Sequence, residues 1–460
     1  MINRRTFIKL SLALSSYALV PQFTYASTLD LSKINFSTDT VNTNSAQTLI
    51  IFLYGGASQL AGNLSNIDEI KTLSQSDYDN YFRSITKTTN NCWKEAGGDA
   101  LESLLRSGDM TLFRACYSQV REDNDNKAHG ECVVQNQKGS FDEDGGGILA
   151  NLAEILQDHN IVNQNSIMPF ATMEGESQFY TEGNVALPSY LKPVGIDASF
   201  SNPYERKGVR RWYYYTEAER DSAPDSYWAS DEKGGFDPAL TKTMDTLAQQ
   251  NNETGIIKDN FSKRVQRSQF INTIKNKSTP DLGADGYPQD NKFAQRIEAA
   301  IKLLVHNPDT KVLTVGTDGL GGWDDHNEAR NYVERSEQLF ISLKSAMAHL
   351  KAENKDDKIN IMVFGEFGRN VNLNSAKGWD HGNLQNFYVL GGNGYFNHKG
   401  IVGETIVEDT GQINRLYLKP KPNTYWFEPL SIAATLYKIY GIENPEVLTG
   451  GYGEITPLFS

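Results

Sequence analysis

The sequence predicts an α/β fold, a mostly parallel sheet with helices on both faces, and three observations support this prediction. Short apolar runs typical of strands alternate along the chain with runs at helical spacing. The clearest strand is 48–54, which reads TLIIFLY, is rich in β-branched residues and ends at Gly55-Gly56. The stretch 332–350 instead carries an apolar stripe at the spacing of a helix.

The remaining elements follow from the same two patterns. We expect further strands at 110–116, 167–172, 311–315, 358–364 and 386–390, and further helices at 148–156, 293–305 and 430–440. Residues 200–290 differ, because they are polar and contain an aromatic cluster at 212–215. We interpret them as a largely helical insertion or cap within one domain that spans 27–460.

The amino-terminal segment resembles an export signal. Arg4-Arg5 precedes Phe7 and Lys9, a short apolar stretch covers 10–20, and Thr24-Tyr25-Ala26 presents the small residues that signal peptidase requires. We predict a twin-arginine signal peptide over 1–26, the twin-arginine export machinery as a partner, and a periplasmic or secreted mature protein. A chance basic patch and an uncleaved membrane anchor are the alternatives. No later segment reaches the roughly 20 apolar residues of a transmembrane span.

Charge and motif content exclude several functions. With 44 basic and 57 acidic residues the net charge is −13, which makes nucleic acid and anionic lipid poor partners. A nucleotide cofactor is not expected, because 391–394 lacks the Gly-Lys-Ser/Thr of a phosphate loop and no G-x-G-x-x-G follows the first strand. Cys92, Cys116 and Cys132 are interpreted as three partly buried thiols, with a Cys116–Cys132 pair as the alternative.

Unusual residues follow three of the predicted strands. In open α/β sheets ligands bind beyond the carboxyl ends of the strands, so these positions indicate where a site would lie. The segments are 54–58 (YGGAS), 318–326 (DGLGGWDDH) and 365–369 (GEFGR), the last followed by 378–382 (GWDHG).

Carboxylates and imidazoles flanked by glycines are what a divalent metal site needs, and zinc, manganese or calcium would be admissible. Local alternatives exist: Asp325 with Glu328 can cap a helix, Glu366 can pair with Arg369, and 380–382 can be an ordinary turn. His129, in a polar loop beside Gly130 and Glu131, is either part of such a site or a surface residue. We expect Gly322 and Gly382 to be needed for tight turns beside the ligands.

Taken in order, these features resemble an exported bacterial family. The twin-arginine leader, the first glycine pair, 321–326 (GGWDDH), 366–369 (EFGR) and 380–382 (DHG) before 389–392 (VLGG) occur in the order seen in domain of unknown function 1501. That family is grouped with the alkaline phosphatase and sulfatase superfamily. The resemblance spans most of the mature chain and is concentrated in 311–405.

The resemblance implies an alkaline-phosphatase-like core and a set of site residues. By analogy with the Asp-His ligand pairs of the superfamily, it implies a metal site that includes Asp324, His326, Asp380 and His381. These four side chains are expected to converge at the carboxyl edge of the sheet. His129 matches a histidine of the family's middle region and is expected to contact substrate or support a ligand.

One departure from the family pattern affects the functional hypothesis. Where the family usually has an aspartate after the first glycine pair, this chain has Ser58 followed by Gln59. Ser58 is then either a nucleophile activated by the metal or the mark of a lost ligand. Glu366 is expected to be a ligand or general base, and Arg369 to hold an anion.

Two functions therefore remain open. The first is a metal-dependent hydrolase of phosphate or sulfate esters, with a small-molecule ester or glycan as its substrate. The second is a non-catalytic envelope protein that keeps the fold and binds glycan or protein through the aromatic cluster at 212–215.

Overall fold

The structure is a computed structural model that describes residues 29–37, 45–74, 78–141, 145–175, 177–183, 186–201, 246, 256–412 and 415–460. The predicted signal peptide, the aromatic cluster at 212–215 and most of the predicted insertion lie outside these ranges. The described part of the insertion contains one long helix, α10 (Ile256–Lys275). The domain boundaries and the export signal stay predictions.

The centre of the molecule is an eight-stranded sheet with the order β10-β2-β9-β6-β1-β5-β3-β4. Every neighbouring pair is parallel except the two pairs made by β9, which runs against both β6 and β2. The predicted fold class, a mostly parallel sheet with helices, is confirmed. Its strands are β1 (Gln47–Leu53), β2 (Met110–Tyr117), β3 (Phe170–Thr172), β4 (Val194–Gly195), β5 (Val312–Val315), β6 (Ile359–Gly365), β9 (Leu384–Gly391) and β10 (Gly400–Val402).

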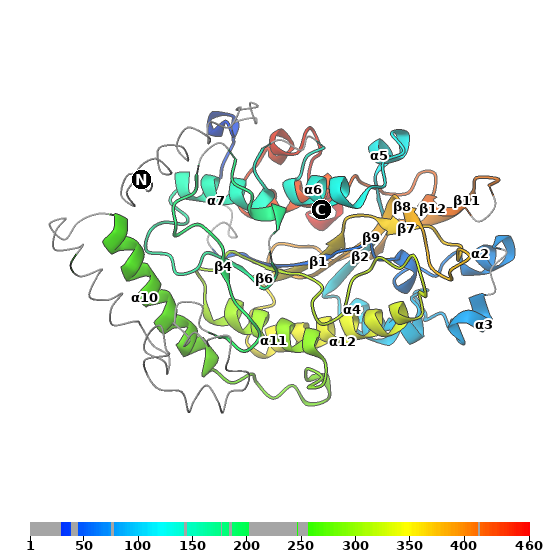
Figure 1. Cartoon of the computed structure of the whole chain (residues 1–460), viewed down its shortest axis with the longest axis horizontal. Coiled ribbons are helices and arrows are strands. Elements are labelled where there is room, and N and C mark those ends of the chain that lie inside the picture. The colour runs from blue at the N-terminus through cyan, green and yellow to red at the C-terminus, as the bar shows by residue number, and fades with distance from the viewer. Residues whose placement is uncertain are drawn as a thin grey trace, which may run out of the picture.

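Helices cover both faces of this sheet (Figure 1). One face packs against α4 (Gly98–Arg106), α11 (Lys292–His306) and α12 (Asn331–Ala352), and the other against α7 (Ile148–Asp158) and α13 (Leu430–Ile439). Side chains of β1 alternate between the two layers: Leu49 and Ile51 belong to the first apolar cluster, Ile50 and Phe52 to the second. Because both faces are covered, β1 is buried at every residue and is apolar without a break from Leu49 to Leu53.

The predicted elements agree with the observed ones to within a few residues at their ends. The helix expected at 293–305 is α11, which starts one residue earlier because the side chain of Asn291 accepts hydrogen bonds from the N–H groups of Phe293 and Ala294. The shorter helices are α2 (Ile67–Leu73), α3 (Tyr78–Phe82), α5 (Gln119–Asp123) and α6 (His129–Lys138).

Two small antiparallel ribbons lie beside the main sheet. One joins β7 (Gly368–Arg369) to β8 (His381–Gly382), and the other joins β11 (Thr405–Asp409) to β12 (Leu416–Pro420). The direction of β9 determines at which edge of the sheet the first ribbon lies. Because β9 runs against β6, the start of β9 lies at the edge where β1, β5 and β6 end, and β8 immediately precedes that start.

The cysteines and the membrane-span prediction can be compared with the structure. Cys92, Cys116 and Cys132 are all buried free thiols. Within the ranges described, no helix combines the length and the apolar character that crossing a bilayer requires.

The two glycines expected at tight turns differ. Gly382 lies close to the neighbouring strand, since a Cβ there would be 2.7 Å from the backbone of Arg369, whereas a Cβ at Gly322 would meet nothing within 4 Å. The expectation for Gly322 was therefore wrong, because its loop has room for a side chain.

Candidate metal centre

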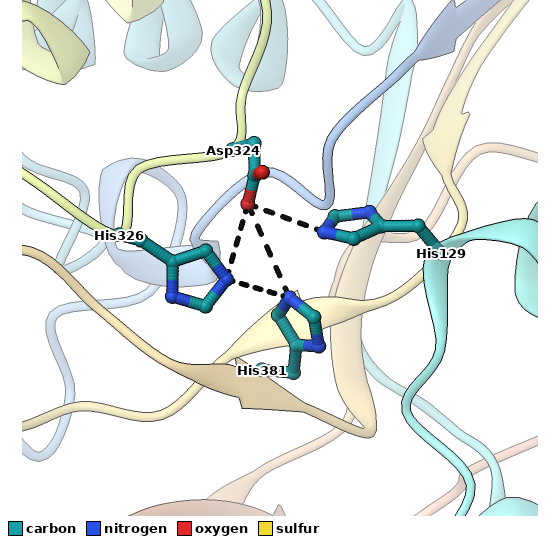
Figure 2. A group of neighbouring side chains, drawn as sticks. All are labelled: His129, Asp324, His326 and His381. Atoms are coloured by element: carbon teal, nitrogen blue, oxygen red, sulfur yellow. Dashed lines mark hydrogen bonds and ion pairs between the residues drawn. The ribbon is translucent and has the colours of Figure 1, made fainter.

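Four side chains from three parts of the chain meet at the carboxyl edge of the sheet (Figure 2). Asp324 and His326 come from the loop after β5, His381 from β8, and His129 is the first residue of α6. One potential ligand atom from each lies within 4.8 Å of the others. The loops after predicted strands thus supply three of the four groups, and the amino end of a helix supplies the fourth.

The four inner atoms are close together. Asp324 Oδ1 is 3.2 Å from His129 Nε2, 3.2 Å from His326 Nε2 and 4.0 Å from His381 Nε2. His326 Nε2 and His381 Nε2 are 2.8 Å apart. Ligand atoms that share one zinc ion, with bonds of about 2.0–2.2 Å, are separated by roughly 3–4 Å, so these spacings fit a single ion with small adjustments.

The outer nitrogens of the three histidines explain why the inner ones converge. Each Nδ1 lies against a carboxylate or carbonyl oxygen, groups that accept hydrogen bonds, so Nδ1 carries the proton and Nε2 keeps its lone pair. This pairing of an outer acceptor with an inner free nitrogen is typical of histidines that bind metals. The contacts are His129 Nδ1 to Glu366 Oε1 at 2.8 Å, His326 Nδ1 to Asp380 Oδ1 at 3.3 Å, and His381 Nδ1 to the Lys127 carbonyl at 2.5 Å.

One inner nitrogen is a buried atom without a hydrogen-bond partner. His129 Nε2 is at ion-pair distance from Asp324 Oδ1, yet the geometry is not that of a hydrogen bond. A buried polar atom left in this way is costly unless something else satisfies it. A metal ion at the point where the lone pairs meet would do so, and the donor set therefore fits a metal.

The charge states of two ligands suit cation binding. Burial raises the pKa of the Asp324 carboxyl, but the hydrogen bond and positive charge of Arg369 outweigh it, so the pKa lies below its usual value and the group is anionic. Burial, together with the charge of Arg369, lowers the pKa of His381 to about 4, so this imidazole is neutral at neutral pH. An anionic carboxylate and neutral imidazoles are the forms that bind metals.

Arg369 holds the surrounding loops together instead of facing solvent. Its side chain is fully buried. Its guanidinium donates to Asp324 Oδ1 at 2.7 Å and to the backbone carbonyls of Gly55, Gly56, Trp323 and Trp379. The predicted role of holding a substrate anion would need donors that are already engaged within the protein.

Glu366 and Asp380 stand behind two of the histidines. Glu366 is 1% exposed, and its Oε1 also accepts the Gly55 N–H at 2.6 Å. Burial raises the pKa of Glu366, although the contacts with His129 and Gly55 act in the opposite direction. Asp380 contacts the outer nitrogen of His326 and does not contribute to the four inner atoms. The sequence predicts Asp380 as a ligand and His129 as a contact to substrate or a supporting residue; in the structure His129 Nε2 lies among the four inner atoms and Asp380 lies behind His326, and the assignment of ligands stays a prediction.

Ser58 and Asp325 take part in other contacts. Ser58 Oγ accepts the N–H of Leu60 at 3.4 Å, and Ser58 belongs to the wall of a small pocket and not to the four-residue cluster. Asp325 forms an ion pair with Arg335. The helix-capping alternative for Asp325 does not describe this structure, because α12 begins at Asn331 without a side-chain cap.

Comparison with known proteins places the chain in a family. The sequence profile of a family described as "Protein of unknown function (DUF1501)" matches residues 48–406. No curated protein matches the sequence.

Solved structures with a similar arrangement share little sequence with the chain. They include the C-terminal periplasmic domain of EcEptC from Escherichia coli in complex with Zn, at 9% identity and a TM-score of 0.35, covering 89% of this chain and 85% of that one. The lipoteichoic acid synthase LtaP from Listeria monocytogenes matches at 10% identity and a TM-score of 0.32, covering 90% and 77%. The PsFucS1 sulfatase from Pseudoalteromonas sp. matches at 9% identity and a TM-score of 0.34, covering 90% and 71%.

Proposed function

We propose that this chain, which belongs to the DUF1501 family of proteins of unknown function, is an exported metal-dependent hydrolase of phosphate or sulfate esters. The observation that carries the proposal is the convergence of three imidazole Nε2 atoms and one carboxylate oxygen, with each Nδ1 held by an acceptor. The ion would be held by His129, Asp324, His326 and His381. When bound, it supplies a Lewis acid that polarises an ester oxygen and lowers the pKa of water.

The donor set favours zinc among the metals that the sequence admits. Three nitrogen donors and one oxygen donor suit zinc, and manganese remains admissible. Calcium is disfavoured because it takes six to eight oxygen ligands.

The exposure of the centre favours a catalytic role over a purely structural one. Structural zinc sites are closed, whereas catalytic sites keep a position open to solvent and substrate. Here the side chain of Asp324 is 51% exposed and that of His326 is 37% exposed. An ester can therefore approach from the side of the loop after β5.

The chain's own residues would orient the ligands. Arg369 fixes the Asp324 carboxylate, Glu366 fixes the ring of His129, and Asp380 fixes the ring of His326. Glu366 is too enclosed to act as a general base on a solvent-exposed substrate, so we assign it to positioning.

The second candidate function is a metal-bearing protein that binds a ligand without hydrolysing it. Two observations favour it: Ser58 belongs to the wall of a separate small pocket, and the donors of Arg369 are engaged with the protein itself. The chain then offers neither of the predicted groups for attacking an ester or holding its anion.

Metal content and ester hydrolysis measured on the same samples test the proposal. We expect about one zinc ion per chain in protein purified after export, and hydrolysis of p-nitrophenyl phosphate or p-nitrophenyl sulfate. Asp324→Ala should lose both. His306→Gln is the matched control, because it removes an imidazole at the end of α11, near the opposite edge of the sheet, and should change neither. Metal-loaded protein that hydrolyses neither ester would favour the binding function.

A further inference from the structure

Residues 29–37 form a strap that lies beside α7 (Figure 1) and includes the short 3-10 helix η1 (Leu31–Lys33). Only Ser27 and Thr28 separate this strap from the predicted signal peptide. Its apolar side chains pack, partly buried, against the second apolar cluster, which includes residues of α7 and α13. They are Leu29, Leu31, Ile34 and Phe36. The segment that follows the signal peptide is therefore docked on the folded domain.

Hydrogen bonds hold the strap to the turn after α13. The Glu443 N–H donates to the carbonyl of Asn35 at 2.8 Å. The side chain of Asn444 adds two more: its Oδ1 accepts the Asn35 N–H at 2.7 Å, and its Nδ2 donates to the Lys33 carbonyl at 2.8 Å. A residue 409 positions further along the chain than Asn35 thus anchors the strap.

The strap and the candidate metal centre lie at opposite edges of the sheet. The ring of Phe36 stacks on that of His159 at the end of α7, with centroids 3.9 Å apart and planes 4° from parallel. The turn that holds the strap follows Tyr440, whose hydroxyl donates to the carbonyl of Lys311, just before β5 begins. Loosening the strap should therefore leave the four-residue cluster undisturbed.

We propose that docking of the strap controls removal of the predicted signal peptide, so that the Ala26–Ser27 peptide bond is hydrolysed only while the strap is released. This inference rests on the export part of the proposed function and not on ester hydrolysis. Three residues separate Ala26 from Asp30, so these two Cα atoms are at most roughly 14 Å apart. A partly buried, hydrogen-bonded segment so near the bond leaves little room for a peptidase. The twin-arginine pathway carries folded proteins, so the strap is docked when the peptidase meets it.

One distant substitution loosens the strap without changing the sequence around the cleavage site. A protease that cuts a transiently opened segment works at a rate set by the population of the open form. Asn444→Ala removes two hydrogen bonds from the docked form, which should raise the open population by about tenfold. We expect signal-peptide removal to become at least about threefold faster.

Cleavage of the purified full-length precursor by signal peptidase in detergent measures this rate without any export step. The matched control is Asn393→Ala, which removes side-chain hydrogen bonds to Asp109 and Asp356 and leaves the contacts of the strap in place. It should be cut at the wild-type rate. Hydrogen exchange of the amides of residues 35 and 37, both bonded to the turn after α13, reports opening of the strap and should be faster in Asn444→Ala only.

A second background separates docking from other effects of the substitution. A flexible linker of about ten glycines and serines, inserted between Thr28 and Leu29, moves the bond away from the docked strap. The precursor with the linker should be cut quickly, and Asn444→Ala should then change the rate by less than about 1.5-fold. Faster exchange without faster cleavage, unchanged exchange, or an equal gain with the linker would overturn the proposal. A wild-type precursor that is never cut would overturn it as well. Loss of ester hydrolysis alone would change none of these rates.

Discussion

The histidines of the candidate metal centre come from two kinds of structure. His326 and His381 belong to short segments at strand ends, flanked by glycines and by other polar ligands in the sequence. His129 begins a helix, α6, that is fastened across the edge of the sheet: Asn136 donates to the carbonyls of Gly365 and Glu366, and Gln137 donates to Tyr54. The first kind of ligand is visible as a local motif. The second is positioned by contacts about two helical turns further along α6, which no local motif reveals.

If the two kinds of histidine are equivalent ligands, removing either should have the same large effect. Loss of a residue that only supports a metal ligand typically weakens metal binding by about 10–100-fold. We expect His129→Ala and His326→Ala each to weaken zinc binding by more than this. Competition with a zinc-chelating dye measures this directly. A fall of less than tenfold for His129→Ala, with loss of binding for His326→Ala, would show that the helix supplies only support.

Glycines at the edge provide a second comparison. Gly55 has φ +103°, and a Cβ there would lie 2.5 Å from the backbone nitrogen of Asp324, whereas Gly322 has open space around it. We expect Gly55→Ala to lower the free energy of unfolding by about 3 kcal/mol, and Gly322→Ala to change it by less than about 1 kcal/mol. Urea denaturation of the two variants compares them. Equal stabilities would mean that the loop after β1 can shift away from Asp324.

Asp380 separates direct ligation from support. Because it contacts the outer nitrogen of His326, Asp380→Ala should weaken zinc binding by about 10–100-fold and leave the stoichiometry unchanged. The same dye competition applies. Complete loss of zinc, as large as that of His326→Ala, would instead make Asp380 a ligand.

His349 lies outside the candidate metal centre, and we expect its substitution to have a small effect on how stability depends on pH. Burial within α12 lowers its pKa to about 4. The unfolded chain then binds more protons, so stability is full above about pH 6.5 and falls as the pH drops towards 4. We expect His349→Gln to flatten this dependence by about 1 kcal/mol between pH 6.5 and 5. Thermal or urea unfolding at several pH values measures this, and the same dependence of stability on pH in the wild type and the variant would contradict the prediction.

The sequence predicted the fold well because most of its strands contain short, predominantly apolar runs. The strand expected at 48–54 and the helix expected at 293–305 each differ from the observed element by only one residue at either end. The antiparallel direction of β9 was not part of the prediction, since an apolar run carries no direction. It nevertheless decides that His381 reaches the same edge as Asp324.

The site was predicted in part. Asp324, His326 and His381 were named, on the motif order of the family, and the structure brings them together. The sequence did not indicate that His129 lies in the four-residue cluster or that Asp380 lies behind His326. Adjacent residues such as Asp380 and His381 point their side chains in different directions, and a motif does not show which of them faces the cluster. The roles of all these residues stay predictions until metal binding is measured. The export signal at 1–26 lies outside the described residues.

The network around Arg369 has a consequence for how quickly an ion could be exchanged. Its guanidinium fastens the segments after β1, β5 and β7 through backbone carbonyls, and these contacts involve no metal. The geometry of the centre should therefore be nearly the same with and without a bound ion. The entropy cost of ordering the loops is incurred when the protein folds and does not reduce the affinity for the ion. Association should be limited mainly by dehydration of the incoming cation, and release should proceed without unfolding of the sheet.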